Sequence, residues 1–258
     1  MTEFCTLHPL DPALVDRYVA AISVAEREAN AEDGLLGGDP IWHRRLLVSA
    51  RRGYAGALAG RESGANAVSY GLAQMLATGH PTYFLPGASF SPWEARVDRG
   101  LGMLLRPPSR LFGEAGLARP AVRAMPIRLD LGAGLMGGAF VPARLVPELG
   151  RQLDERAERL VRRLMAAELD AVAILGLLME ATTYAADRGF GLYEALDVVV
   201  PEAPEADPPG AVVIGPDRKR VPAPLRQRLE EAAKPPKKPT LASRLLRRGP
   251  KPTTEPTV

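Results

Sequence analysis

The sequence predicts a mostly α-helical domain, arranged like a helical bundle, that is followed by a basic tail. Of its 258 residues 46% are apolar but only 5% are aromatic, which favours closely packed helices over an aromatic-rich β-sandwich. Helix-start signals recur in the first half, and a long heptad-like seam follows them. The composition turns Pro-rich after residue 200. We therefore expect one helical domain over residues 1–200 and a flexible Pro-rich, Lys/Arg-rich tail over residues 201–258.

Three segments begin with the same helix-start signal, at Asp11-Pro12, Asp39-Pro40 and Ser91-Pro92. An Asp or Ser side chain can accept hydrogen bonds from the first free backbone N–H groups of a helix, and proline fits the first helical position. Apolar residues at helical spacing follow each start. The same spacing over residues 65–75 predicts another helix, which ends before Gly79.

The segments between these helices contain more turn-forming residues. Residues 79–91 are predicted to form a packed loop because they are rich in Gly, Pro and Ser. Apolar and charged residues alternate from Ile127 to Leu131, which is the pattern of a short half-buried strand. Residues 211–221 are expected to form a small hairpin around Gly215.

The strongest periodic signal lies between residues 146 and 187. Leu, Ile and Ala recur there at alternating spacings of four and three over roughly nine helical turns. The pattern predicts one long helix, or two that join near Asp170, whose seam either forms internal core or mediates self-association. Residues 192–200 are predicted to form a further short helix. The seam consists of Leu153, Ala157, Leu160, Leu164, Ala167, Ala171, Ile174, Leu178, Ala181 and Ala185.

Three carboxylates interrupt the apolar half of this helix, at Glu168, Asp170 and Glu180. Buried carboxylates are costly unless they are paired. Their spacing does not place them together on one helix face, so they do not form an obvious catalytic pair. The carboxylates are therefore paired with arginines, exposed on a narrow face or functional, and arginine pairing is the default expectation.

The few cysteines and histidines limit the chemistry that the chain can carry. The single Cys5 allows no internal disulfide, and His8, His43 and His80 lack the spacing of metal ligands. We therefore expect neither a metal site nor a cofactor. The longest purely apolar run, at residues 171–179, is shorter than the ~20 residues that span a bilayer. With no secretory signal at the N-terminus, these features predict a cytoplasmic protein without a transmembrane segment.

A glycine-rich stretch at residues 132–137 matches the G-x-G-x-x-G spacing of dinucleotide-binding loops. Such a loop needs a buried strand before it and an uninterrupted helix after it. Here charged residues occupy the preceding strand, and Pro142 and Pro147 interrupt the following segment. A turn that lets the backbone pack closely is the simpler interpretation. A second interpretation is an anion-binding loop formed by backbone N–H groups, with Gly132, Gly134, Gly137, Gly138 and Arg144 as its candidate residues.

The basic tail is the most direct functional signal. Residues 217–258 hold 12 Lys or Arg and four Asp or Glu, whereas residues 1–216 hold 21 Arg and 26 Asp or Glu. A flexible basic segment attracts phosphates and other acidic groups without sequence preference. The candidate contacts are Arg218, Lys219, Arg220, Lys234, Lys237, Lys238, Arg244, Arg247 and Arg248.

Together these patterns favour a non-enzymatic binding or scaffolding protein whose tail engages a nucleic acid, an anionic membrane surface or an acidic protein. Self-association through the helix over residues 146–187 is a further expectation. The alternative is an enzyme or a small-anion-binding protein with a pocket between the loops at residues 79–91 and 132–138. His80, beside the aromatic residues of the first loop, is the candidate ligand-contacting side chain of that pocket.

Overall fold

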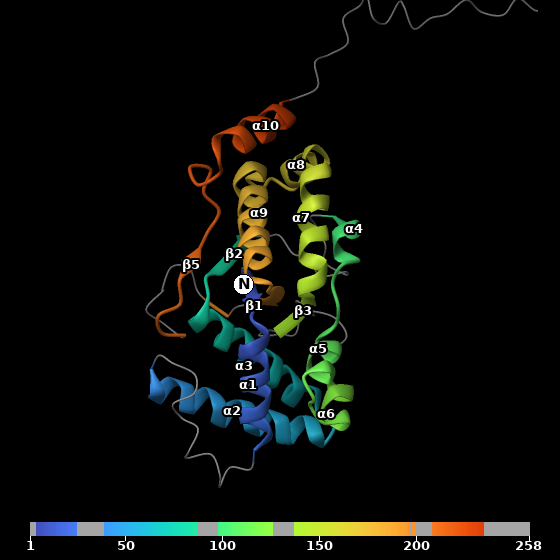
Figure 1. Cartoon of the computed structure of the whole chain (residues 1–258), viewed down its shortest axis with the longest axis vertical. Helices are drawn as coiled ribbons and strands as arrows, with labels where there is room; N and C mark the ends of the chain where they lie inside the picture. The colour runs from blue at the N-terminus through green and yellow to red at the C-terminus, as the bar shows by residue number, and fades with distance from the viewer. Residues whose placement is uncertain are drawn as a thin grey trace, which may run out of the picture.

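In the computed structural model a β-sheet lies between two layers of helices (Figure 1). The structure describes residues 4–24, 39–86, 98–125, 137–196, 198–199 and 208–234. Helices predominate in this part of the chain, which confirms the prediction of a mostly helical protein. The five-stranded sheet corrects the expectation of an all-helical bundle with one minor extended segment. The segment for which a strand was predicted, residues 127–131, lies outside the described residues.

The sheet has the strand order β3-β4-β1-β2-β5. Its central strand comes from the N-terminal part of the chain and pairs antiparallel with β4 and β2, so that Leu7 lies between Glu194 and Tyr83. β3 is antiparallel to β4, and β5 is parallel to β2. The strands are β1 (Phe4–Leu10), β2 (Thr82–Pro86), β3 (Gly137–Val141), β4 (Gly191–Leu196) and β5 (Val213–Ile214).

Three local predictions are wrong because these segments join the sheet. The predicted loop at residues 79–91 contains β2, and the predicted helix at residues 192–200 begins with β4. Residues 211–221 do not form a hairpin around Gly215, because β5 pairs with β2 instead. All six residues of β4 are buried, since helices cover both faces of the sheet. A strand that is buried on both faces loses the apolar–polar alternation by which strands are recognised.

The first helical layer confirms two of the three predicted helix starts. Asp11 accepts a hydrogen bond from the N–H of Ala13 (2.9 Å), and Asp39 accepts one from the N–H of Ile41 (2.8 Å). The third start, Ser91-Pro92, lies outside the described residues. The layer consists of α1 (Pro12–Ser23), α2 (Pro40–Leu58), α3 (Glu62–Gly79), α5 (Pro108–Glu114) and α6 (Arg119–Ala124).

The second helical layer shows that the predicted single helix over residues 146–187 is wrong. The chain bends at Arg156, and it turns again between Ala166 and Asp170, where Glu168 adopts a left-handed conformation (φ 60°). Asp170 caps the next helix through the N–H of Ala173 (3.2 Å), so the predicted junction near Asp170 is the second break. The elements are η2 (Ala143–Leu145), α7 (Val146–Glu155), α8 (Ala157–Ala166), α9 (Ala171–Arg188) and α10 (Ala223–Ala233), with the short α4 (Arg99–Gly102) beside α7.

The turn before Asp170 lets α9 return beside α7 and cover the sheet (Figure 1). The seam residues Leu153, Ala157, Leu160 and Leu164 are at most 4% exposed. They belong to the apolar core between these helices and the sheet. Ala167 is the exception, because it is exposed just after the end of α8. The rest of the seam supplies the interior of this chain, and self-association through it remains a prediction.

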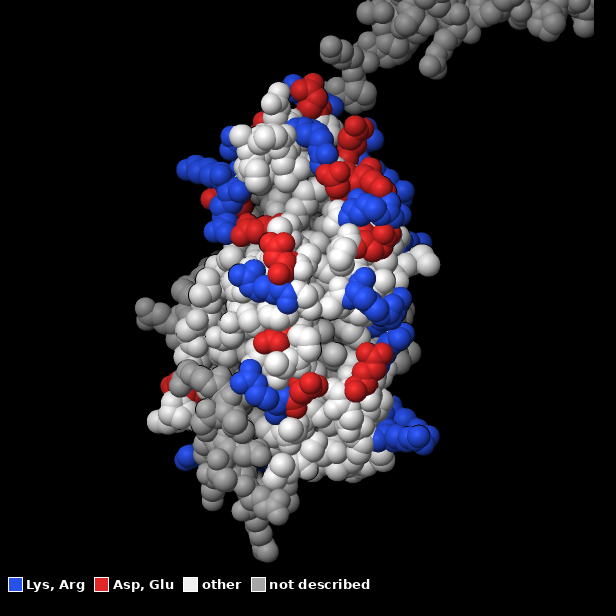
Figure 2. All heavy atoms as spheres, viewed as in Figure 1, with Lys and Arg blue, Asp and Glu red and all other residues white. Residues whose placement is uncertain are grey.

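Residues 208–234 pack on the second layer, although their composition assigned them to the flexible tail. α10 contacts α8 and α9, and its Leu229 is 0% exposed. Acidic and basic side chains are interspersed on the face that carries α7, α9 and α10 (Figure 2). Among the described helices, none is long and apolar enough to cross a membrane.

Candidate functional site

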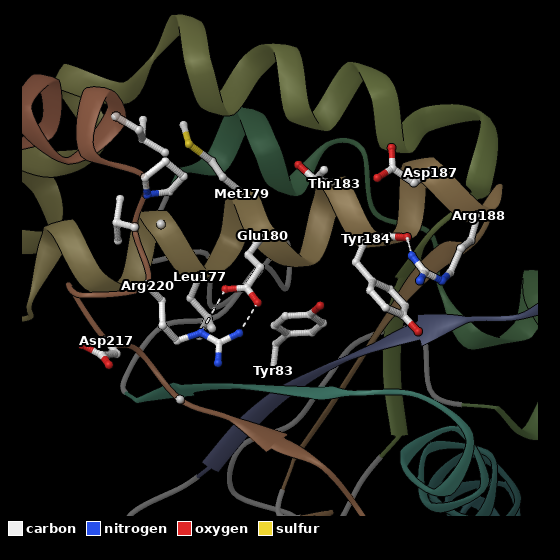
Figure 3. Close-up of a pocket in the computed structure, with 15 residues that line it drawn as sticks. Tyr83, Leu177, Met179, Glu180, Thr183, Tyr184, Asp187, Arg188, Asp217 and Arg220 are labelled. Carbon is white, nitrogen blue, oxygen red and sulfur yellow. Dashed lines mark hydrogen bonds and ion pairs between the residues drawn. The ribbon is translucent and has the colours of Figure 1, made fainter.

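A cavity of about 400 Å³ lies between α9, β2 and the segment that leads into α10 (Figure 3). Its volume is in the range of small-molecule sites. Most of its lining comes from one face of α9, where the side chains recur at intervals of three and four residues. The lining residues are Tyr83, Gly176, Leu177, Met179, Glu180, Thr183, Tyr184, Asp187, Arg188, Gly215, Asp217, Arg220, Val221, Pro222 and Leu225.

Register in the sheet explains why Tyr83 reaches this cavity. Tyr83 pairs with Leu7 of β1, and both side chains lie on the face of the sheet that α9 covers. The neighbouring Thr82 points to the opposite face, where its hydroxyl contacts His8 (3.2 Å). Because side chains alternate between the two faces of β2, Tyr83 points towards the cavity and Thr82 points away from it.

An ion pair between Glu180 of α9 and Arg220 supplies the fixed charges of the cavity. Arg220 Nη2 donates to Glu180 Oε1 (2.5 Å) and its Nε donates to Oε2 (3.4 Å). This hydrogen bonding raises the pKa of Arg220. The third guanidinium nitrogen, Nη1, has no hydrogen-bond partner among the described residues. Both side chains remain partly exposed, so the pair contributes little to stability but leaves a donor available.

Two tyrosine rings lie on the other side of this ion pair. Figure 3 shows Tyr83 between the Glu180–Arg220 pair and Tyr184, and the two ring centroids are 6.4 Å apart. Burial and the negative charge of Glu180 raise the pKa of Tyr83 well above its ordinary value. Its phenol therefore stays protonated near neutral pH. Arg188 lies over the ring of Tyr184, with Cζ 3.7 Å from the centroid, which is a cation–π contact.

A second ion pair holds the same wall segment outside the cavity. Arg218 Nε donates to both carboxylate oxygens of Asp170 (3.0 and 2.8 Å). Burial alone would raise the pKa of Asp170, but the hydrogen bonds from Arg218 and from the N–H of Ala173 outweigh it and lower the pKa. The expected arginine pairing is confirmed for Asp170 and Glu180. It is wrong for Glu168, which is exposed and has no ion pair among the described residues.

His80, the predicted ligand contact, lies beside the cavity but does not line it. Its Nε2 is 3.5 Å from Asp11 Oδ2, and its Nδ1 is 3.4 Å from the hydroxyl of Tyr184. Burial lowers the pKa of His80, although Asp11 acts in the opposite direction. His80, directly after α3, thus contacts both Asp11 at the start of α1 and the hydroxyl of Tyr184.

Gly137 and Gly138, the two described glycines of the predicted anion-binding loop, do not lie near His80. Gly137 and Gly138 belong to β3, and Arg144 lies in η2 directly after that strand. Two strands separate β3 from β2, which corresponds to about 14 Å. Gly132 and Gly134 lie outside the described residues, so their predicted role is untested.

Among the described basic residues predicted to bind an acidic partner, Arg220 alone lines the cavity. Arg218 pairs with Asp170, and Lys234 Nζ is 3.2 Å from Glu231 Oε2. Lys219 is exposed. The predicted contacts Lys237, Lys238, Arg244, Arg247 and Arg248 lie outside the described residues.

The two tyrosines were not predicted as site residues, because Tyr83 and Tyr184 lie far apart in the sequence and meet only in the fold. One available signal was the spacing of Gly176, Glu180, Tyr184 and Arg188 at exact intervals of four, which aligns them on one helix face. Comparison with protein-family models, curated proteins and solved structures found no match to this chain. Within the described ranges no group of His, Cys, Asp and Glu has the arrangement of a metal site.

Proposed function

We propose that the protein binds a small, largely apolar molecule with an uncharged oxygen at one end, such as a ketone or an alcohol. The observation that carries this proposal is a cavity with apolar walls whose central charges neutralise each other. Leu177, Met179 and Leu225 offer apolar contact to the body of the ligand. Glu180 and Arg220 form an ion pair at the same cavity.

The polar groups of the cavity favour an uncharged ligand oxygen. The Nη1 group of Arg220 donates to a carbonyl or hydroxyl oxygen, and the protonated phenol of Tyr83 offers a second donor. An anionic ligand would gain little electrostatic stabilisation from Arg220, because Glu180 already neutralises its charge. The remaining charged residues of the lining, Asp187, Arg188 and Asp217, carry one net negative charge, which also disfavours an anion.

This proposal keeps the expectation of a binding protein, but it assigns the protein a small molecule rather than an acidic macromolecule. Binding of an acidic partner by the basic tail remains a separate prediction. The two are independent, because the cavity is formed by residues up to Leu225, whereas most tail contacts lie beyond Lys234.

The proposal is tested with prodan, a neutral naphthyl ketone whose fluorescence depends on its surroundings. We expect saturable binding with a blue-shifted emission. Thr183→Trp fills the cavity from an exposed position on α9 and is expected to weaken prodan binding by about tenfold or more. Ala186→Trp, an exposed substitution on the same helix that is not part of the lining, is the matched control. Equal binding by both variants would refute the proposal.

A second variant tests the polar end of the site. Arg220→Met removes the Nη1 donor but keeps most of the apolar stem. Bound prodan is expected to emit at shorter wavelength in this variant, because its carbonyl loses a hydrogen-bond donor. An unchanged emission spectrum would show that Arg220 does not contact the ketone oxygen.

A further inference from the structure

A cluster of three arginines around one buried carboxylate lies at the junction of α7 and α8. Asp98 is 1% exposed and precedes α4, where it accepts a hydrogen bond from the N–H of Gly100 (2.6 Å). Its carboxylate oxygens lie 3.2 Å from Arg156 Nη1, 3.4 Å from Arg159 Nη2 and 3.3 Å from Arg163 Nη1. We call these four residues the Asp98 cluster.

The Asp98 cluster has two more positive than negative charges. The nearby acidic residues of α7 and α8 are engaged by other arginines. Glu148 and Glu155 pair with Arg151, and Glu158 pairs with Arg162. Among the described residues Asp98 is thus the one carboxylate paired with these three guanidinium groups.

The arginines keep most of their donors available. A guanidinium has five N–H donors, and each arginine of the cluster directs one terminal nitrogen to Asp98. Arg156 and Arg163 are 34% and 37% exposed, and Arg159 is 64% exposed. The buried carboxylate therefore holds three guanidinium groups together with their remaining N–H groups accessible from solvent.

Packing further restricts the position of Arg156. Its guanidinium lies directly against Gly100, where any side chain would collide with it. A fixed set of guanidinium donors binds tetrahedral oxyanions well, because the planar fork matches two oxygens of a phosphate. Pre-organisation also reduces the entropy that binding would otherwise cost.

We propose that the Asp98 cluster binds a phosphate group. A phosphate monoester carries close to two negative charges at neutral pH, which balances the excess charge of the cluster. The site is separate from the cavity on α9, and the proposal does not depend on the function assigned to that cavity. Asp98 aligns the arginines, and Arg156, Arg159 and Arg163 contact the phosphate oxygens.

The first test is calorimetric titration of the full chain with inorganic phosphate, in which chloride keeps the ionic strength constant. We expect saturable binding that Arg159→Gln weakens by about tenfold, the usual effect of losing one charged hydrogen bond. Arg162→Gln, which removes a neighbouring arginine that pairs with Glu158, is expected to change the affinity by less than about twofold. No saturable binding, or equal losses in the two variants, would overturn the proposal.

Asp98→Asn distinguishes a binding site from a purely structural ion cluster. The amide oxygen keeps the hydrogen bond to Gly100, but the negative charge that competes with phosphate is gone. The amide aligns Arg159 and Arg163 less well, but removal of the competing charge is expected to outweigh this loss, so that phosphate binds the variant several-fold more tightly and raises its melting temperature more than that of the original protein. A variant whose melting temperature is equally insensitive to phosphate and chloride would contradict the proposal.

Two further titrations identify the source of the phosphate group. Glycerol phosphate represents a soluble monoester, and vesicles of phosphatidic acid represent a lipid headgroup, with phosphatidylcholine vesicles as the control. Arg159-dependent binding of glycerol phosphate supports a soluble ligand, and Arg159-dependent binding confined to phosphatidic acid supports a membrane lipid. Binding of neither probe by the original protein would refute the site.

Discussion

His8 is a fully buried histidine of the central strand, and its surroundings keep it neutral. Its ring nitrogens contact the hydroxyls of Thr6 (2.8 Å) and Thr82 (3.2 Å). Burial lowers its pKa to about 3, whereas in the unfolded chain the value is about 6.5. The unfolded state therefore takes up a proton below about pH 6.5 that the folded state does not bind until about pH 3.

This difference predicts that His8 makes the protein less stable as the pH falls from about 6.5 towards 3. The loss approaches about 1.4 kcal/mol for each pH unit within that window, and above it the contribution is constant. Urea unfolding of the original protein and His8→Gln at about pH 7 and about pH 5 measures it. The variant lacks this titration, so the stability difference between the two proteins should shrink at the lower pH. A difference that stays constant would contradict the prediction.

Gly64 is required where α2 and α3 cross. A methyl group at this position would lie 2.5 Å from the carbonyl oxygen of Gly53 and 2.6 Å from the backbone nitrogen of Ala57. Gly64→Ala is therefore expected to destabilise the protein by about 2 kcal/mol, because backbone atoms cannot move aside easily. Gly113→Ala in α5 is the control, since its methyl group would meet only Val122 at 3.6 Å. Denaturant unfolding should show the control to be neutral or slightly stabilised. Equal losses would refute this account.

At the scale of elements, local signals predicted the capped helices but not the sheet. The Asp-Pro pairs at Asp11 and Asp39 specify helix starts through contacts within a few residues, so the sequence alone reveals them. Strands β1 and β4 pair although most of the first 190 residues separate them in the sequence, and no local pattern indicates such a partner. The heptad seam indicated buried positions correctly except at Ala167, which is exposed just after α8. It did not indicate the break at Arg156, because the buried apolar positions keep the same spacing across that break.

The local or distant origin of each contact also decides which part of the site was predictable. Unpaired carboxylates in an apolar helix require counter-charges, so arginine pairing of Asp170 and Glu180 followed from electrostatics alone. The identity of the partners, Arg218 and Arg220, depends on β5 pairing with β2. Tyr83 reaches the cavity through that same sheet. Residues from distant segments meet only after the fold forms, and the cavity was therefore not visible in the sequence.

A substitution in α10 can show how stably the wall of the cavity is attached to the rest of the protein. Its Leu229 is completely buried against the core of the second layer, and the segment that leads into α10 lines the cavity. Leu229→Ala is expected to cost about 2–3 kcal/mol and to raise hydrogen exchange in residues 210–233 before the rest of the protein opens. Leu58→Ala, at a position that is 43% exposed, should cost much less. If hydrogen exchange in residues 210–233 matched that of the rest of the protein in both variants, α10 would not open separately.

At the scale of the whole molecule, the packing of α10 changes how the basic tail should be tested. A chain that ends near residue 208 would lose β5, α10 and two ion pairs to α9, so lost binding could reflect damage to the fold. A chain that ends at Lys234 keeps all of these elements. It removes six basic residues, namely Lys237, Lys238, Arg244, Arg247, Arg248 and Lys251.

We expect the full chain to bind a mixed-sequence DNA duplex with an affinity that falls steeply as salt increases. If all six basic residues contact phosphates, the logarithm of the affinity falls with the logarithm of the salt concentration with a slope of about −5. The chain that ends at Lys234 should bind prodan as the full chain does, but should lose the salt-dependent DNA binding. RNA and anionic vesicles, titrated in the same way, show which acidic surface is preferred. Equal DNA binding by both chains would place the contact on the folded body, where Arg159 and the rest of the Asp98 cluster become the residues to substitute.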